Sequence, residues 1–203
     1  QQKQKEQYEL SRENISLINR KCHDLKHQVA ALRTVRDETE REASLREIER
    51  SVMIYDSIVK TGNEVLDTVL TEKSLLCEQE HITMTCVADG SKLGFMDAVD
   101  LYTIFGNALD NAIESALTIP DPERRVITVT VYTRSNLLLI QLENYYEGSL
   151  TFADGLPVTT KEHNGYHGYG MKSIRFTAEK YGGVVTVNTA DNLFILRVSI
   201  PMA

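Results

Sequence analysis

The sequence lacks long apolar runs, an excess of positive charge and any closely spaced pair of cysteines. Its apolar runs are far shorter than the roughly 20 residues of a transmembrane helix, so we expect no membrane contact within it. Lysine and arginine total 22 against 29 for aspartate and glutamate. This balance argues against nucleic acid as a partner, because phosphates are neutralised by clustered basic side chains. The cysteines, Cys22, Cys77 and Cys86, indicate free thiols in a reducing cytoplasm.

An initiator methionine is also missing, and the chain starts with Gln1 in a helix-forming run. We therefore interpret the sequence as a cytoplasmic piece of a longer protein, and we expect an upstream segment to anchor that parent protein in the cell membrane. The 203 residues, 42% of them hydrophobic, can bury one substantial core and a smaller helical element. One or two domains are expected.

The first of these domains is predicted over residues 1–62. Apolar side chains recur at alternating spacings of three and four over residues 8–32 and again over residues 45–59, with a charged turn around residues 36–42. This is the heptad pattern of a coiled coil, and two such helices form an antiparallel hairpin. Because one hairpin cannot bury both of its apolar seams, we predict a homodimer in which two hairpins form a four-helix bundle.

The second domain is predicted over residues 63–203, where helices alternate with strands of period two. The expected helices span 64–80, 101–116 and 171–181, and the expected strands span 81–87, 126–132, 137–142, 184–188 and 193–200. This order predicts an α+β fold with helices on one face of a mainly antiparallel sheet. The segment from 144 to 170 exceeds the usual length of a structureless loop and predicts a lid or binding loop.

A polar line on an otherwise apolar helix is the most informative feature of the second domain. Residues 101–116 carry a wide core-facing stripe, and the other line holds Asn107, Asp110, Asn111 and Glu114. Asparagine and aspartate are poor helix formers, so a merely solvated face would use other residues. Amide oxygens suit Mg²⁺, which prefers oxygen ligands and bridges substrate phosphates. The line indicates a ligand site, with a hydrogen-bonded polar face as the alternative.

A glycine-rich stretch, Gly165-Tyr166-His167-Gly168-Tyr169-Gly170-Met171, ends the long segment directly before a predicted helix. Glycines let backbone N–H groups approach phosphate, and a helix N-terminus adds positive partial charge. Alone the motif is weak evidence, since most such turns are only turns. Together with the asparagine-lined helix it predicts a nucleotide site.

These two motifs resemble boxes of the GHKL (Bergerat) superfamily, an α/β sandwich that binds ATP. Asn107-x-x-x-Asn111-Ala112 is similar to the N-box and Gly168-Tyr169-Gly170-Met171 to the second glycine box, over residues 63–201. The resemblance implies ATP and Mg²⁺ as ligands. It makes Asn111 the Mg²⁺ ligand with Asn107 assisting, and it places His167, Gly168 and Gly170 in the loop region that closes over the phosphates.

Three positions depart from family patterns. GHKL ATPases carry a glutamate where Asn107 stands, and because asparagine cannot activate water, its presence favours phosphoryl transfer over hydrolysis. The kinase box Asp-x-Gly-x-Gly is missing, and we expect the amide oxygen of Asn144 to accept from the adenine amino group instead, with a plain strand-end turn as the alternative. Glu114 stands where many kinases carry a lysine. Lys161 is therefore our candidate for neutralising the negative charge of the phosphates, with an ordinary solvated loop lysine as the alternative.

The phosphoryl acceptor is predicted in the first heptad run, at Cys22-His23-Asp24-Leu25-Lys26-His27. Cys22 and Leu25 fill the apolar seam, which turns His23 and His27 outward on one side. His-Asp-x-x-His within a dimerising hairpin resembles the H-box of sensor histidine kinases, in the branch that includes peptide quorum-sensing receptors. The resemblance implies phosphorylation of His23, a base role for Asp24 and transfer to the aspartate of a response regulator receiver domain. His27 stands where relatives often carry an amide or hydroxyl linked to phosphatase activity.

The resulting hypothesis is a two-component histidine kinase that phosphorylates itself with ATP. The main alternative is a non-catalytic, nucleotide-gated GHKL scaffold or sequestration module, which would bind ATP without labelling itself. An ATP hydrolase is the third possibility, disfavoured by Asn107.

Overall fold

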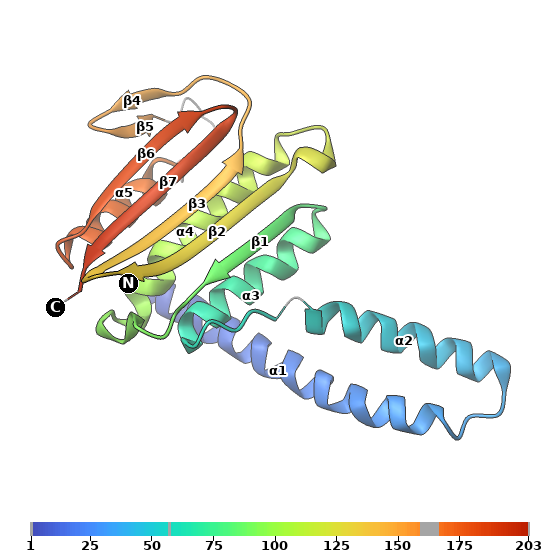
Figure 1. Cartoon of the computed structure of the whole chain (residues 1–203). Helices are drawn as coiled ribbons and strands as arrows, with labels where there is room; N and C mark the ends of the chain where they lie inside the picture. Colours follow the sequence, from blue (N-terminus) through green and yellow to red (C-terminus); the bar gives the residue numbers. More distant parts are fainter. Residues whose placement is uncertain (1, 57, 159–166, 203) are drawn as a thin grey trace.

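The computed structural model of the chain describes residues 2–56, 58–158 and 167–202. Figure 1 shows a sheet backed by helices and, extending from it, two long helices that run in opposite directions. These are α1 (Gln2–Leu32) and α2 (Glu38–Asp56). None of the helices that the structure describes combines the length and apolar character needed to cross a membrane.

The turn between α1 and α2 covers residues 33–37 and is shorter than the stretch around 36–42 that the sequence suggests. The hydroxyl of Thr34 donates to the Ala31 carbonyl (2.7 Å) where α1 ends. Asp37 accepts from the backbone N–H of Thr39 (3.3 Å), and Glu38 and Glu40 lie in the first turn of α2, where negative charge is favourable. Charged residues therefore start the second helix instead of prolonging the turn. Pairing with a second copy stays a prediction, as does a domain boundary at residue 62.

The remaining helices and strands form a two-layer α/β sandwich. In chain order these are α3 (Glu64–Gln79), β1 (Thr83–Ala88), η1 (Leu93–Phe95), α4 (Ala98–Leu117), η2 (Pro122–Arg124), β2 (Val126–Arg134), β3 (Leu137–Tyr145), β4 (Thr151–Ala153), β5 (Leu156–Val158), α5 (His167–Glu179), β6 (Val184–Ala190) and β7 (Leu193–Pro201). The main sheet has the order β1-β2-β3-β7-β6, in which only β1 and β2 pair in parallel. The predicted α+β class and mainly antiparallel sheet are confirmed.

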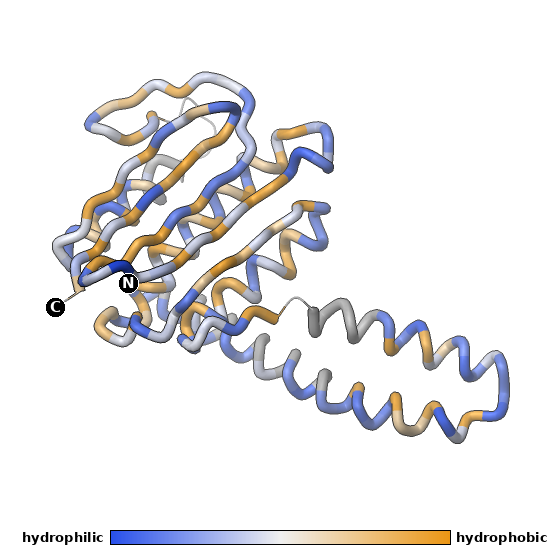
Figure 2. The backbone as a smooth tube through the Cα atoms, viewed as in Figure 1, coloured by the Kyte–Doolittle hydropathy of each residue, from blue (hydrophilic) through white to orange (hydrophobic). Residues whose placement is uncertain are grey.

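The core lies between the sheet and helices α3, α4 and α5. Side chains alternate in burial along β2 and β3, as period-two strands require, and the hydropathy-coloured tube of Figure 2 shows apolar residues along the strands of the sheet. Phe105 of α4 and Ile140 of β3 are almost completely buried. Burial of such a side chain contributes about 1.5–3 kcal/mol, so the apolar stripe of α4 fixes this helix against the sheet.

The segment from 144 to 170 contains ordered structure where the sequence suggests a long loop. Strands β4 and β5 form a separate hairpin. Its turn places Asp154 (φ 52°) and Gly155 (φ 73°) in the left-handed region, which these residue types tolerate well. The dipeptide Asp154-Gly155 is a hairpin signal that the length argument overlooked. Residues 159–166, and with them Lys161, lie outside the described residues.

Helix α5 begins at His167, four residues earlier than expected. Gly168 and Gly170 therefore belong to its first turn and not to a preceding loop. The glycine stretch was expected to precede the helix, but its last residues are already helical and this turn packs against α4.

Candidate functional site

A cavity of about 290 Å³ opens between the second half of α4, the end of β3 and the β4–β5 hairpin. Its lining residues are Asn111, Glu114, Ser115, Thr118, Asn144, Tyr146, Ser149, Leu150, Thr151, Pro157, Val158, Met171 and Phe194. Most of the lining surface is apolar, although more than half of the lining residues carry a polar group, among them Asn111, Glu114 and Ser115 of α4 and Asn144 of β3. The volume is close to the lower end of the range for small-molecule sites.

The side chains of the polar line on α4 face three different neighbours: the cavity, α3 and the first turn of α5. Asn111 and Glu114 line the cavity, whereas Asp110 points to α3, where it pairs with Lys73 (2.8 Å). Asn107 is half-buried near the first turn of α5 and is not among the described residues that line the cavity. Asn111 therefore faces the cavity, whereas Asn107 lies beside the first turn of α5.

The first turn of α5 lies beside the N-box motif. A Cβ added at Gly170 would lie 3.5 Å from Asn111 Oδ1 and 3.9 Å from the Cβ of Asn107. Both predicted motifs thus meet in space. The backbones of His167 and Gly168 belong to the same turn, so the described start of α5 and the amide oxygen of Asn111 border one region.

An ion-pair clamp at the other end of α5 holds this arrangement. The ammonium group of Lys180 donates to both carboxylate oxygens of Asp100 (2.8 and 2.9 Å), and the hydroxyl of Tyr181 donates to Asp100 Oδ2 (2.6 Å). Burial and the bond to Asp100 raise the pKa of Tyr181 to about 12. Because the clamp joins the end of α5 to the start of α4, the first turn of α5 falls beside the second half of α4.

Asn144 lies in the cavity wall and is only 3% exposed. Its amide nitrogen donates to Ser115 Oγ (3.0 Å) and to the Tyr145 carbonyl (3.1 Å). Because the Tyr145 carbonyl can only accept a hydrogen bond, the end of the Asn144 amide that faces it must be the nitrogen. The carboxamide oxygen is then the group that a ligand in the cavity can address, and Ser115, as an acceptor from Asn144, retains an O–H to donate.

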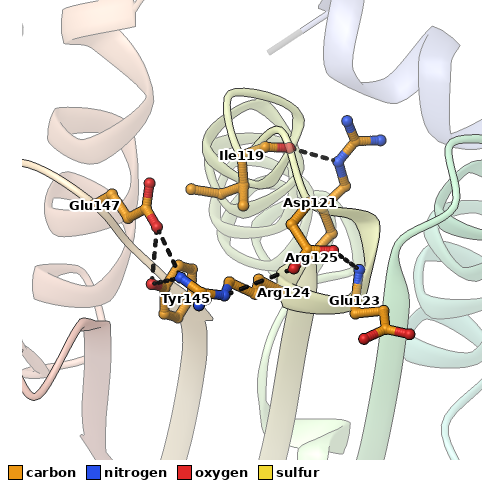
Figure 3. A network of polar contacts seen from close by, with 7 residues as sticks. All are labelled: Ile119, Asp121, Glu123, Arg124, Arg125, Tyr145 and Glu147. Atoms are coloured by element: carbon orange, nitrogen blue, oxygen red, sulfur yellow. Dashed lines mark hydrogen bonds and ion pairs between the residues drawn. The ribbon is translucent and has the colours of Figure 1, made fainter.

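A second polar network joins the segment after α4 to the end of β3 and is shown in Figure 3. Arg124 donates to the hydroxyl of Tyr145 (3.1 Å) and to Glu147 (3.4 Å), and the Tyr145 hydroxyl donates to Glu147 (2.9 Å). The bond to Tyr145 and the charge of Glu147 raise the pKa of Arg124. Arg125 donates to the Ile119 carbonyl (2.8 Å). The network ties the segment after α4 to the end of β3, the two elements that carry Ser115 and Asn144.

The predicted phosphoryl acceptor lies on α1, outside the cavity. The side chains of His23 and Asp24 are 72% and 73% exposed, with His23 Nδ1 3.8 Å from Asp24 Oδ1. This distance is too long for a hydrogen bond but leaves Nδ1 facing the carboxylate. The ring of His27 lies beside that of His23, with centroids 4.9 Å apart. The exposure expected of an acceptor is present.

The first half of α1 packs on the sandwich, and His23 lies beyond this contact. Arg12 pairs with Glu64 of α3 (2.7 Å), and Tyr8 packs on Tyr102 of α4. His23 follows Arg12 by about three turns, roughly 16 Å along the helix axis. Figure 1 shows the paired part of α1 and α2 extending away from the sheet. Contact between His23 and the cavity thus requires a change in arrangement or a second subunit.

The donor set fits a Mg–nucleotide better than a free metal ion. Among the described residues, no three His, Cys, Asp or Glu side chains gather into a metal-binding cluster. Asn111 offers an amide oxygen at the polar end of the cavity, and Mg²⁺ commonly completes its ligands with phosphate oxygens and water. Leu150, Met171 and Phe194 give the apolar walls that a base requires.

The two-layer sandwich, with a cavity between an amide-bearing helix and the first turn of a second helix, defines a class of nucleotide-binding domains. The chain belongs to the GHKL domain family, which it matches over residues 96–201. No curated protein matches the sequence.

The fold is similar to that of a solved histidine kinase catalytic domain, ThkA. The nucleotide-free catalytic domain of the histidine kinase ThkA has a TM-score of 0.54 and 18% identity, over 70% of this chain and 93% of that domain. The Acinetobacter baumannii histidine kinase AdeS has a TM-score of 0.47 and 12% identity, over 90% of this chain and 95% of its own. The histidine kinase domain of the blue-light activated kinase from Erythrobacter litoralis EL346 has a TM-score of 0.47 and 14% identity, over 94% of each chain.

Lys73 and Ser115 are the main residues of this region that sequence reasoning missed. Lys73 occupies the same buried face of α3 as Leu66, Leu70 and Cys77. A lysine within an apolar stripe is a signal of a buried ion pair, since unpaired burial of charge is costly. Ser115 carries no comparable signal, because serine is common near helix ends.

Proposed function

We propose that this chain is the catalytic part of a sensor histidine kinase, which transfers the γ-phosphoryl group of ATP to His23 and then to an aspartate of a response regulator. The observation that carries the proposal is the cavity of a GHKL fold, bordered by Asn111 and Asn144, in one chain with an exposed histidine–aspartate pair on a long helix. The resemblance of the H-box supports placing it in the peptide quorum-sensing branch.

In this proposal, adenine enters between the apolar walls of the cavity. The Asn144 oxygen accepts from the adenine amino group, and the Ser115 hydroxyl donates to the neighbouring ring nitrogen. The phosphates then extend toward Asn111 and the N-terminus of α5, whose backbone N–H groups attract anions. Mg²⁺, when bound with Asn111 as ligand and Asn107 assisting, would neutralise charge on the phosphate oxygens.

The chemical step follows from the position of Asp24. Nδ1 of His23 faces the Asp24 carboxylate, so a small side-chain movement would let its N–H donate to Asp24 and would leave Nε2 as the nucleophile. Nε2 attacks the γ-phosphorus, and the bond to the bridging oxygen breaks as ADP leaves with that electron pair. Asn107 offers no carboxylate to activate water, so the imidazole has no competing base at that position.

A homodimer would supply the necessary encounter, because His23 projects away from the cavity of its own subunit in the arrangement described here. The alternative of a nucleotide-gated scaffold would use the same cavity, but it needs no acceptor histidine. The two possibilities differ in whether the protein labels itself.

Autophosphorylation with γ-labelled ATP separates them. We expect acid-labile, alkali-stable label that His23→Gln abolishes and His27→Gln retains, since only His23 has the carboxylate at its Nδ1. Label that persists in His23→Gln would contradict the assignment. A folded protein that binds Mg·ATP but stays unlabelled would favour the scaffold.

Calorimetry of Asn111→Asp tests the site separately. A carboxylate in place of the amide adds negative charge beside the phosphates, and we expect Mg·ATP affinity to fall at least about tenfold. Unchanged affinity would place the nucleotide elsewhere.

A further inference from the structure

The strongest unassigned feature is a polar chain that leads from α1 to the N-box motif. It starts at Tyr8, only 9% exposed, whose ring packs edge-on against Tyr102 with centroids 5.7 Å apart. The hydroxyl of Tyr102 donates to Glu72 Oε2 (3.1 Å). Lys73, next to Glu72, pairs with Asp110, the residue directly before Asn111. Helices α1, α3 and α4 are thus joined through side chains that the proposed phosphoryl transfer does not use.

Lys73 lies between two carboxylates and pairs unequally with them. Its ammonium nitrogen is 2.8 Å from Asp110 Oδ1 and 3.6 Å from Glu72 Oε1. Burial lowers the pKa of Lys73, but Asp110 and Glu72 more than offset this and raise it above its ordinary value. The group is therefore a permanent cation, and its side chain is only 6% exposed.

The Tyr102 hydroxyl decides how this cation is shared. While it holds one oxygen of Glu72, the other oxygen stays at 3.6 Å and Lys73 remains with Asp110. Without the hydroxyl bond, one restraint on Glu72 is lost, and we expect its carboxylate to move closer to Lys73. Asp110, whose side chain is 48% exposed and faces α3, would then carry less compensated charge one residue before Asn111.

We propose that Lys73 and Tyr102 are positioning residues of the nucleotide site, and that docking of α1 through Tyr8 keeps Lys73 on Asp110 and so raises the affinity for Mg·ATP. The inference rests on the proposed nucleotide site. Its physical basis is like-charge repulsion: a less compensated carboxylate one residue before Asn111 opposes a bound triphosphate, and pairing with Lys73 reduces that opposition. Undocking of α1 lowers nucleotide affinity without any contact between α1 and the nucleotide.

Calorimetric titration of the whole chain with Mg·ATP tests the inference. Tyr102→Phe keeps the ring that packs on Tyr8 and removes only the hydroxyl, and Tyr8→Ala removes the docking ring. We expect each to weaken binding about fivefold or more, the lower range of measured couplings between sites. Tyr132→Phe is the matched control, because it removes the hydroxyl of a 45% exposed tyrosine on β2; its affinity should equal that of the parent chain.

The decisive background is Asp110→Asn, which has no carboxylate to release. There, Tyr102→Phe and Tyr8→Ala should leave the affinity of the Asp110→Asn protein unchanged. A loss of affinity that persists in this background would overturn the inference, because it would show a general structural effect of the substitutions. Equal affinity of all variants with the parent chain would overturn it as well.

Hydrogen exchange separates this inference from the proposed function. In nucleotide-free protein, amides of residues 107–114 should exchange faster in Tyr102→Phe and Tyr8→Ala than in the Tyr132→Phe control, because the Lys73–Asp110 tether between α3 and α4 is weakened. If no variant binds Mg·ATP, the proposed function fails while faster exchange still supports the network. Unchanged exchange in such a protein would remove the network too.

Discussion

At the scale of single residues, the neighbours of a side chain decide its role more than its type does. Asn107 and Asn111 belong to one sequence motif, yet of these two only Asn111 lines the cavity. Asp110, which lies between them in the sequence, forms an ion pair with Lys73. Asn144 is another case. Its amide nitrogen is fixed by a backbone carbonyl and a serine, so an amide at this position has an orientation that a carboxylate could not adopt.

Asn144→Asp should therefore destabilise the protein although relatives of the kinase class use aspartate to read adenine. An ionised carboxylate would face the Tyr145 carbonyl, and the lost donor should cost about 1–3 kcal/mol at pH 8. Repulsion raises the pKa of this new carboxyl in the folded state above its unfolded value, so stability is kept at low pH and lost as pH rises through the folded pKa.

Thermal unfolding at pH 5 and pH 8 checks this expectation. The melting temperature of Asn144→Asp should fall further below that of the parent chain at pH 8 than at pH 5. Asn136→Asp, in the exposed turn between β2 and β3, is the control. An equal deficit at both pH values would mean that the new group does not titrate against the carbonyl.

At the scale of helices and strands, the β4–β5 hairpin forms one wall of the cavity and is anchored at its turn. Arg175 of α5 donates to the Asp154 carboxylate (2.9 Å) and to the Asp154 carbonyl (2.5 Å). Thr151, Pro157 and Val158 of the hairpin reach the cavity. The position of this wall thus depends on the same helix whose first turn borders Asn111.

Arg175→Met should loosen the hairpin without unfolding the domain. Since Asp154 is 95% exposed, we expect a stability loss within about 1 kcal/mol, but faster hydrogen exchange at residues 151–158 and about threefold weaker Mg·ATP binding. Arg46→Met, which removes an exposed pair with Glu42 on α2, is the control. Exchange at parent rates would show that the hairpin is held by its other contacts.

Periodicity predicted the strands and most helices within a few residues, because each has one buried face. Burial repeats every second residue in β2 and β3 and follows the helical period in α4. The predicted start of α5 was wrong because the glycine stretch was expected to end a loop before the helix, whereas residues 167–170 are helical and pack on α4. The β4–β5 hairpin was missed because its strands are only three residues long.

The candidate site was predictable only in part. The asparagine line and the glycine stretch are each a short local motif that can be recognised in the sequence. The structure brings them together at Asn111 and Gly170. The partners of Asn144 and Asp110 come from positions 29 and 37 residues away, at Ser115 and Lys73. Contacts between distant elements of this kind follow from packing, and a single sequence does not encode them as a local pattern.

At the scale of the whole molecule, the α1–α2 helices expose apolar side chains that a second copy would cover. Val29 is 44% exposed and Leu45 is 40% exposed, although both belong to helices with heptad spacing. Covering such a side chain contributes about 1.5–3 kcal/mol. This exposure supports the proposal that the chain is a homodimer.

Sedimentation equilibrium should find a dimer for the parent chain and a monomer for Val29→Lys/Leu45→Lys, because two buried charges per subunit would oppose association. Val184→Lys, at a 61% exposed position on β6, should remain dimeric. A parent chain that sediments as a monomer would contradict the bundle, and the encounter of His23 with a cavity would then require movement within one subunit.

The contact between Tyr8 and Tyr102 also bears on how the protein is dissected for study. A truncated fragment that starts at residue 63 would retain the sheet, the cavity and the GHKL motifs, but the ring of Tyr102 would lose its cover and Glu64 its guanidinium partner. Nucleotide constants measured on such a fragment would describe the state without docked α1. Chimeric sensors that join this sandwich to a foreign input helix would need an aromatic residue in the place of Tyr8 to preserve the native response.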